Sequence, residues 1–445
     1  QDLDNPQHTR VWLGEARGNP TKYTPPMTRQ CLTLVAILAM TGCASVTDDR
    51  TALRLTNWGG AGDDGEFSRL VKDLYAEFEA ENPTLDLRIE GIPGSQEYVT
   101  KLLLSFVART EPDIITLDAS SSAVFINNGV LMDLTPLIEQ DPEFNIDDYW
   151  PNVVDIARRG DKLYAIPVDF TPMVMYYNRR MFREAGLPEP QSGWTYADFL
   201  TAAKALTKPG QHGFEFANWM PGWITWLWNN GGDVLHPETH RAVGTLDSDE
   251  NVAAVEFLRD MIKVHRVAPS LSQAASTGVD LFATNQAAMK ISGHWSIVGF
   301  ADPKTSKIAL DDIGVVELPT NLPQSVTVMY ESGYAIGKNC RNPEAAWAFI
   351  KFMTSRRVQE RYNASGIAVC GRQDVAEAKQ ADRLEGAFNR IVPSARAPWG
   401  TKIEAYAVVE DIGQRMMNSV LQQGRPVREA LKSAAEEIDR ELARQ

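Results

Sequence analysis

Residues 160–182, which read GDKLYAIPVDFTPMVMYYNRRMF, constrain the fold of this chain more than any other stretch. β-Branched and aromatic residues fill its middle and favour extended chain. Pro167 and Pro172 exclude a helix, because proline lacks the N–H that an interior helical position donates. The pattern predicts two short strands flanking a kinked crossing. A strand ending at Pro167 would release the short polar side chains of Asp169 and Thr171 into the gap that the crossing spans.

Two segments at the start of the chain do not have the pattern of a globular domain. Residues 1–26 carry no apolar periodicity, and we expect them to be a spurious upstream extension, with the true start at Met27. Residues 27–42 have the three-part form of a lipoprotein signal peptide, with Arg29, a short apolar run and small residues before Cys43. The apolar run of about 10 residues is too short for a membrane anchor, which needs roughly 20. We expect cleavage before Cys43 and a lipid anchor on it, which would hold the protein outside the bacterial cell membrane, in the periplasm if an outer membrane is present.

Length and composition limit the classes of protein to which the chain can belong. Its 445 residues, 44% of them hydrophobic, exceed what one core usually supports and predict two domains. The formal charge of −14 argues against nucleic acid or polyanionic partners. Cys340 and Cys370 are the thiols left in the processed chain, too few for a disulfide framework, and we expect them to stay unlinked.

Strand and helix patterns alternate through the first part of the chain. We expect strands at 53–57, 85–92 and 112–118, and helices at 66–81 and 96–108. This alternation predicts a mostly parallel α/β sheet, in which ligands meet the carboxyl ends of the strands. Further along, we expect helices at 194–206, 220–230 and 251–264 and strands at 315–319 and 333–336.

Three stretches resemble one known family. KLYAIP followed by YYN and MFREAGLP, within residues 162–188, resembles the first interlobe crossover of the sugar-binding proteins that serve ABC importers, extracellular solute-binding protein family 1. AAMKISGHW at 287–295 resembles that family's strand and turn presenting a tryptophan to the cleft. GYAI at 333–336, followed by NPEAAWAFIKFM, resembles the return to the first lobe.

The resemblance implies a periplasmic-binding-protein-like α/β fold, with two lobes joined by a multi-crossover hinge and a ligand cleft between them. It places the first lobe at 51–166 plus 324–368 and the second at 167–323 plus 369–445. It further implies a monomeric, non-enzymatic sugar-binding component, similar to maltose- and trehalose-binding proteins. Such a component binds a disaccharide or short oligosaccharide and delivers it to the permease subunits of an ABC transporter, without a cofactor.

Strand ends and the resemblance together nominate a set of sugar-binding residues. Tryptophan packs its flat face on the C–H side of a pyranose, carboxylates accept hydroxyl hydrogen bonds, and the arginine fork suits vicinal hydroxyls. The candidates are Trp58, Asp64, Gln96, Asp118, Asp169, Thr171, Trp223, Trp295, Gly333, Tyr334, Arg372 and Arg396.

Ordinary structural roles compete with several of these assignments. Asp118, Asp64 and Gln96 could instead cap helices. Trp223 lies in a helical stripe of tryptophans, which is usually core. Surface ion pairs are the commoner role of arginines such as Arg372 and Arg396.

Catalytic and metal-binding motifs are missing from the sequence. Tyr176 and Tyr177 resemble the tyrosine pair of ferric-ion binders but would face opposite sides of a strand. His236 and His240 are separated by Pro237, which prevents a shared helical face. Two alternatives to a sugar-binding protein remain open. One is a secreted glycoside hydrolase, which needs two carboxyls about 5 to 10 Å apart. The other is a binder of a sugar phosphate, which would favour basic cleft residues, or of a polyamine, which would favour acidic ones.

Overall fold

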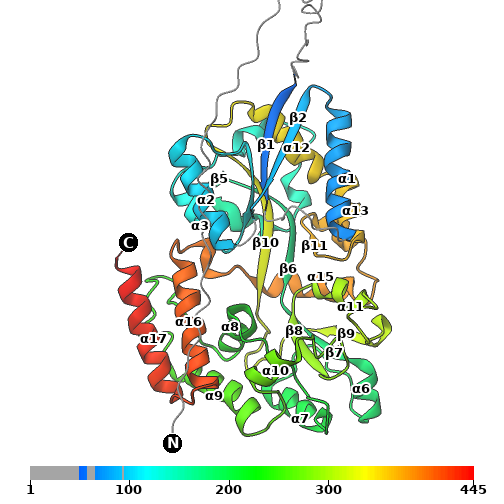
Figure 1. The fold of residues 1–445 in the computed structure, drawn as a ribbon, viewed down its shortest axis with the longest axis vertical. Coiled ribbons are helices and arrows are strands. Elements are labelled where there is room, and N and C mark those ends of the chain that lie inside the picture. The colour runs from blue at the N-terminus through cyan, green and yellow to red at the C-terminus, as the bar shows by residue number, and fades with distance from the viewer. Residues whose placement is uncertain (1–49, 58–65, 93–94, 445) are drawn as a thin grey trace, which may run out of the picture. The chain divides into compact units, whose positions relative to one another are not determined.

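A computed structural model describes residues 50–57, 66–92 and 95–444 of the chain (Figure 1). Two sheets carry the fold. The larger has seven strands in the order β11-β6-β10-β3-β1-β2, with β12 paired to β10. Its strands are β1 (Thr51–Asn57), β2 (Leu85–Gly91), β3 (Ile114–Asp118), β6 (Ile166–Pro172), β10 (Thr327–Ile336), β11 (Val369–Cys370) and β12 (Ala395–Arg396).

The direction of pairing changes across this sheet. Strand β1 pairs in parallel with β2 and β3, whereas β10 runs antiparallel to both β3 and β6. The prediction of a mostly parallel sheet is therefore wrong for the pairing of β10 with β3 and β6 and of β6 with β11, which is antiparallel. The prediction fails because β10 comes from late in the chain and inserts between β3 and β6. The local alternation of strand and helix patterns carries no signal of that insertion.

The second sheet is antiparallel and has three strands. Strand β7 (Val174–Asn178) lies between β8 (Met289–Ser292) and β9 (Ile313–Val316). A small hairpin joins β4 (Arg158–Arg159) to β5 (Lys162–Leu163). Strands β6 and β10 run from the larger sheet towards the smaller one and so link the two parts of the fold (Figure 1).

Helices pack around each sheet. Those around the larger sheet are α1 (Glu66–Glu81), α2 (Ser95–Ala108), α3 (Ser122–Asn127), α4 (Thr135–Glu139), α5 (Pro151–Val154), α12 (Pro343–Met353) and α13 (Arg356–Ala364). The others are α6 (Arg179–Glu184), α7 (Tyr196–Leu206), α8 (Met220–Trp228), α9 (Asp249–Lys263), α10 (Leu271–Thr277), α11 (Ser296–Ala301), α14 (Gln373–Glu377), α15 (Glu385–Ile391), α16 (Tyr406–Leu421) and α17 (Val427–Leu442). Short 3-10 turns occupy Ile146–Asp148, Asp155–Ala157, Leu310–Asp312, Val392–Ser394 and Trp399–Thr401.

Two large hydrophobic cores correspond to the two lobes. The first forms where amphipathic α1 and α12 cover the larger sheet, and the Phe78 and Phe349 rings meet edge to face at 5.1 Å. The second lies between α7, α8, α9 and α16, and there the Phe199 and Trp226 rings meet at 5.1 Å. A third cluster surrounds the crossing itself and includes Phe170 and Tyr176. Separate cores allow the lobes to move as units about the strands that join them.

The crossing is more continuous than the prolines indicated. Strand β6 runs through Pro167 to Pro172, so the prediction of a strand that ends at Pro167 is wrong. Pro167 pairs with Gly333 where the register shifts after Ser332, and such irregularities tolerate a residue without an N–H. Asp169 and Thr171 are consequently paired strand residues, and as predicted they also border a cavity.

The two cysteines lie in different surroundings. Cys340 packs against the first core, and Cys370 is buried in the cluster around the crossing. Both are free thiols, as predicted. In the part of the chain that the structure describes, no helix has the length and apolar character to cross a membrane.

Candidate functional site

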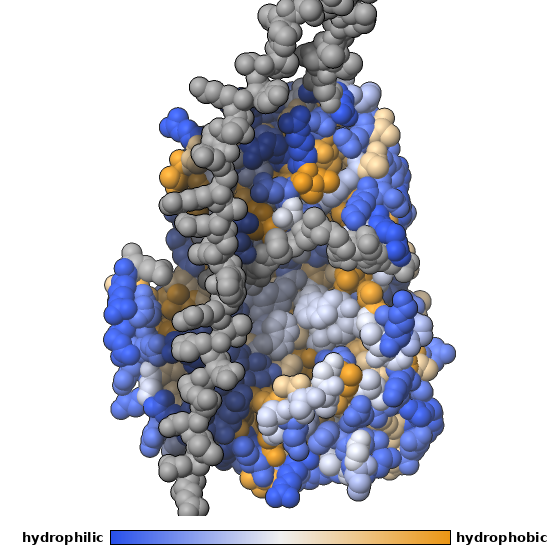
Figure 2. Space-filling model, in the orientation of Figure 1, coloured by the Kyte–Doolittle hydropathy of each residue, from blue (hydrophilic) through white to orange (hydrophobic). Residues whose placement is uncertain are grey.

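A cavity of about 510 Å³ opens beside the carboxyl end of β3. This volume lies within the range of about 300 to 1,000 Å³ that is usual for small-molecule sites. Its lining residues are Asn57, Ser68, Val71, Tyr75, Thr116, Asp118, Ser120, Val168, Asp169, Thr171, Trp295, Tyr330, Glu331, Ser332, Tyr334, Tyr362, Ile367 and Ala368. In the space-filling view, pale side chains of intermediate hydropathy lie recessed across the middle of the molecule (Figure 2).

Both parts of the fold supply this lining. Strands β3, β6 and β10 of the larger sheet place Asp118, Asp169 and Glu331 in the cavity. Helices α1 and α13 add Tyr75 and Tyr362 from the same side. Trp295 comes from the turn between β8 and α11, which belongs to the second part. The cavity therefore lies at the junction of the two lobes.

Asp118 combines the two roles that the sequence left open. Its Oδ1 accepts a hydrogen bond from the Ser121 backbone N–H at 2.9 Å, which orders the turn before α3. The same residue lines the cavity. Burial raises the pKa of the Asp118 carboxyl, and hydrogen bonds from the Ser121 and Ser120 amides oppose that rise.

Asp169 is held by a tyrosine from α13. The Tyr362 hydroxyl donates a hydrogen bond to Asp169 Oδ2 at 2.7 Å. Burial nevertheless raises the pKa of Asp169 to about 6, against the opposing effect of this bond and of Ser332. This carboxyl thus changes charge near neutral pH, because removal of water disfavours its ionised form.

Glu331 is a site residue that the sequence analysis missed. It lies on β10, is only 2% exposed, and its Oε2 has no hydrogen-bond partner. Burial raises the pKa of the Glu331 carboxyl well above its ordinary value, and the charges of Asp169 and Asp118 raise it further. Strand alternation gives no local signal that this glutamate faces a cavity rather than solvent.

Aromatic side chains form much of the remaining wall. The Tyr75 and Tyr334 hydroxyl oxygens lie 3.4 Å apart, within hydrogen-bond distance. Trp295 is half-buried, and its ring meets that of Trp219 at 6.2 Å in an edge-to-face arrangement. Trp219 itself is not among the residues that line the cavity; it is 41% exposed and begins the tryptophan stripe that contains Trp223.

Thr171 links the two lobes at this point. Its Oγ1 accepts a hydrogen bond from the His294 backbone N–H at 2.7 Å. His294 is fully buried, with Nε2 3.0 Å from Glu385 Oε2 and Nδ1 3.0 Å from the Gly366 carbonyl. These contacts fix the turn that carries Trp295, so Thr171 positions a cavity residue in addition to lining the cavity.

Some predicted residues lie away from the cavity. Trp223 is fully buried in the second core and packs against α16, so in this structure it cannot contact a ligand there. Gly333 lies on β10 and is not among the residues that line the cavity. A Cβ added at Gly333 would come within 2.4 Å of Glu331 Oε1. Its absent side chain gives the glutamate room.

The two predicted arginines are bound elsewhere in the protein. Arg372 makes ion pairs with Asp148 and with Asp374 at 2.9 Å, and its side chain is 12% exposed. The Arg396 guanidinium lies over the Trp228 ring, 5.7 Å from its centroid. Neither residue lines the cavity, so the alternative reading of Arg372 as an ion-pair residue fits its contacts better.

Four further candidates cannot be placed. Trp58, Asp64 and Cys43 lie outside the described residues. Gln96 belongs to α2, but its side chain lies outside the description.

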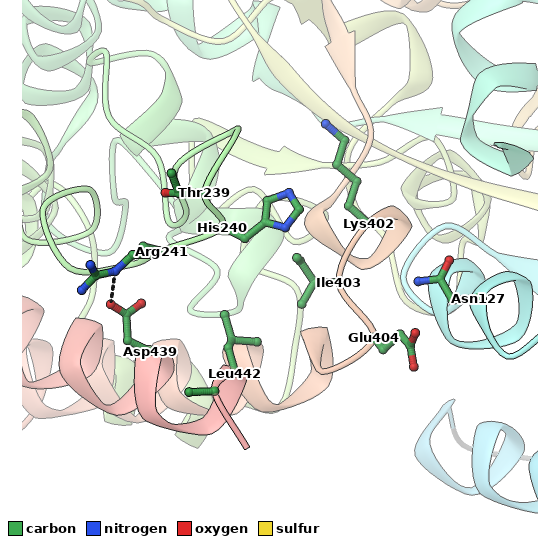
Figure 3. Close-up of a pocket in the computed structure, with 10 residues that line it drawn as sticks. Asn127, Thr239, His240, Arg241, Lys402, Ile403, Glu404, Asp439 and Leu442 are labelled. Atoms are coloured by element: carbon green, nitrogen blue, oxygen red, sulfur yellow. Dashed lines mark hydrogen bonds and ion pairs between the residues drawn. The ribbon is translucent and has the colours of Figure 1, made fainter. Parts of the chain in front are cut away.

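A second cavity, of about 670 Å³, lies beside the end of α17 (Figure 3). His240, Lys402 and Glu404 line it, and the Arg241–Asp439 ion pair at 3.2 Å closes one side. Its described lining has no tyrosine or tryptophan, so it offers no stacking face for a sugar. Among the described residues, no group of three or more His, Cys, Asp or Glu side chains could hold a metal ion.

Comparisons with known proteins agree on the class of protein. The chain is 23% identical to a putative binding protein of Brucella abortus (strain 2308), over 91% of this chain and 96% of that protein. Its fold is similar to that of an ABC substrate-binding protein from Listeria monocytogenes in complex with cycloalternan, with a TM-score of 0.76, 23% identity and coverage of 89% and 100%. It is also similar to that of UgpB from Mycobacterium tuberculosis in complex with glycerophosphocholine, with a TM-score of 0.72, 20% identity and coverage of 89% and 99%.

These similarities extend across both sheets and the cavity between them. The family model described as bacterial extracellular solute-binding protein matches residues 61–360, which include β3, β6, β10 and the Trp295 turn. The chain therefore belongs to the bacterial extracellular solute-binding proteins.

Proposed function

We propose that this protein is the substrate-binding component of an ABC importer and that it binds a disaccharide or short oligosaccharide in the cavity at the lobe junction. One observation carries the proposal: Trp295 from the second lobe and the Asp118, Asp169 and Glu331 carboxyls from the first line the same cavity. A stacking face opposite hydrogen-bond acceptors suits a sugar ring, which has a C–H side and a rim of hydroxyls.

The binding mechanism follows from this division of the lining between lobes. A ligand that contacts both lobes stabilises the closed arrangement more than the open one, and so shifts the population towards closure. Strands β6 and β10 would act as part of the hinge, with the first lobe at 51–166 plus 324–368 and the second at 167–323 plus 369–445. The closed form would then dock on the permease. Binding and closure require no covalent chemistry, and we propose that the protein is not an enzyme.

Processing of the N-terminal region belongs to the same proposal. Residues 27–42 would be removed as a signal peptide, and a lipid on Cys43 would anchor a monomer outside the cell membrane. Labelling of growing cells with a radioactive fatty acid tests the anchor, since label should enter the wild type and not a Cys43→Ser variant. Sedimentation of the protein without its signal peptide tests the monomeric state.

A thermal-shift screen against a panel of sugars tests the binding function. A ligand present at 100 times its dissociation constant adds about 2.7 kcal/mol to the free energy of unfolding. At least one disaccharide or oligosaccharide should raise the melting temperature, while a hydrolysis assay with the same sugars should release no product. If no sugar on the panel shifts melting, or if the protein hydrolyses the sugar it binds, the proposed function is wrong.

A further inference from the structure

The lobe-junction cavity has an unbalanced charge. Asp118, Asp169 and Glu331 line it, and none of its described lining residues is a lysine, arginine or histidine. No lysine or arginine is among the groups that shift the pKa values of the three carboxyls. The described lining therefore supplies acidic groups to the cavity without a lysine, arginine or histidine that would compensate them.

Glu331 gives this imbalance a specific position. Its side chain is nearly inaccessible to solvent, and Oε2 has no partner. An unpaired carboxylate in such a place costs several kcal/mol, and the usual remedies are a proton or a cationic partner. Neutral hydroxyls can satisfy the hydrogen-bonding capacity of Oε2, but they leave the charge uncompensated.

Aromatic faces surround the same carboxyls. Tyr75, Tyr330, Tyr334, Tyr362 and Trp295 all line the cavity. The negative face of an aromatic ring attracts a cation, and the attraction strengthens when water is excluded. Rings and carboxylates together thus favour an ammonium group, whereas a phosphate group would meet three acids and no base.

We propose that the natural ligand is a sugar that carries a protonated amine, and that the ammonium group binds at Glu331 while the ring stacks in the aromatic wall. This inference rests on the proposed sugar-binding function and specifies its ligand class. The ammonium donates hydrogen bonds to Glu331 Oε2 and shares the charge of Asp169 and Asp118, which act on Glu331 through space.

Matched pairs of sugars test this inference by calorimetric titration. Trehalose and 2-amino-2-deoxytrehalose differ only where one hydroxyl becomes an amine, and cellobiose and its 2,2′-diamino counterpart differ only where two hydroxyls become amines. At about pH 7, an amine with a pKa near 8 is mostly protonated. The inference predicts that in the pair that binds, the amine form binds at least tenfold more tightly. Equal or tighter binding of the neutral form would overturn the inference and leave the proposed function intact.

A change of the protein tests the assigned position. Glu331→Gln keeps the shape of the side chain and removes its charge, so the preference for the amine form over the neutral form of the same sugar should fall at least fivefold. Glu404→Gln in the second cavity is the matched control and should keep the full preference. If Glu331→Gln does not fold, Asp169→Asn is used in its place, and the preference for the amine form should fall in that variant as well. An unchanged preference would overturn the assignment.

A third arm separates the inference from the proposed function. Spermidine carries ammonium groups but no sugar ring, and it should bind at least tenfold more weakly than the preferred amino sugar. Binding of spermidine with no response to any sugar would refute both proposals.

Discussion

Asp169→Asn is expected to stabilise the unliganded protein, and increasingly so as pH rises. The Asp169 pKa is raised to about 6 in the folded protein, from an ordinary value near 3.8, chiefly because the carboxyl is buried. Between these values the folded state binds more protons than the unfolded state. The stability that Asp169 contributes is thus fully present below about pH 4 and is lost as pH rises through about 6.

The size of the effect follows from the two pKa values. One pKa unit corresponds to about 1.4 kcal/mol. This rise in the pKa of Asp169 therefore limits the loss in the free energy of unfolding, which ionisation of the buried carboxyl causes, to about 3 kcal/mol at high pH. At pH 4.5 most of that penalty is absent. The gain in the free energy of unfolding from Asp169→Asn should therefore increase by about 2 kcal/mol between pH 4.5 and pH 7.5. Loss of the Asp169 charge also relieves Glu331, which acts in the same direction.

Urea unfolding of the unliganded wild type and variant at the two pH values measures this difference. Asp374→Asn is the control, because its carboxyl has the opposite shift. Burial tends to raise the pKa of Asp374, but the hydrogen bond and charge of Arg372 outweigh it and hold the pKa below its ordinary value. The stability contributed by Asp374 is lost only as pH falls below about 4. The free energy of unfolding of Asp374→Asn should therefore lie below that of the wild type by a similar amount at both pH values. A pH-independent effect of Asp169→Asn would refute the reasoning.

Three further predictions concern packing and the predicted arginine. Gly413→Ala should lower the free energy of unfolding by about 1 to 3 kcal/mol, measured by urea unfolding, because the added Cβ would lie 2.8 Å from the Trp223 ring; an unaffected stability would contradict that close contact. Arg372→Ala should lower it by about 1 to 3 kcal/mol through loss of the ion pairs, yet leave sugar affinity within twofold, and a large loss of affinity would restore Arg372 to the site. Cys370, whose thiol pKa burial raises to about 12, should react with a thiol reagent only as fast as the protein unfolds, and rapid reaction of the native protein would show that its site is open.

Local signals in the sequence predicted the individual elements well. The expected helix at 66–81 matches α1, whose apolar face covers the sheet, and the expected strand at 53–57 lies within β1. Asp118 was found by the rule that ligands meet the carboxyl ends of strands, and it does line the cavity. These successes depend on periodicity and on short-range turn chemistry.

Features that depend on long-range contacts were not predictable in this way. The position of β10 between β3 and β6 brings Tyr330 and Glu331 to the cavity, and nothing near them in sequence indicates it. The tryptophan stripe of α8 predicted a helix rich in tryptophan, but it did not predict which tryptophan side chain would be exposed to solvent. Packing against α16 buries Trp223, whereas Trp219 at the start of the helix remains exposed.

Calorimetric titration of three variants with the best sugar from the screen tests the central claim, that both lobes hold one ligand in the cavity at their junction. Trp295→Ala removes the stacking face of the second lobe and Asp118→Ala removes a charged acceptor of the first, and each should cost about 1 to 3 kcal/mol of binding. Glu404→Gln, in the second cavity, should bind as the wild type does. Melting of the unliganded variants separates binding from folding, because a tryptophan buried in a core costs about 3 to 5 kcal/mol of stability when cut to alanine. Wild-type affinity in both Trp295→Ala and Asp118→Ala, or a loss of affinity in Glu404→Gln alone, would contradict the claim.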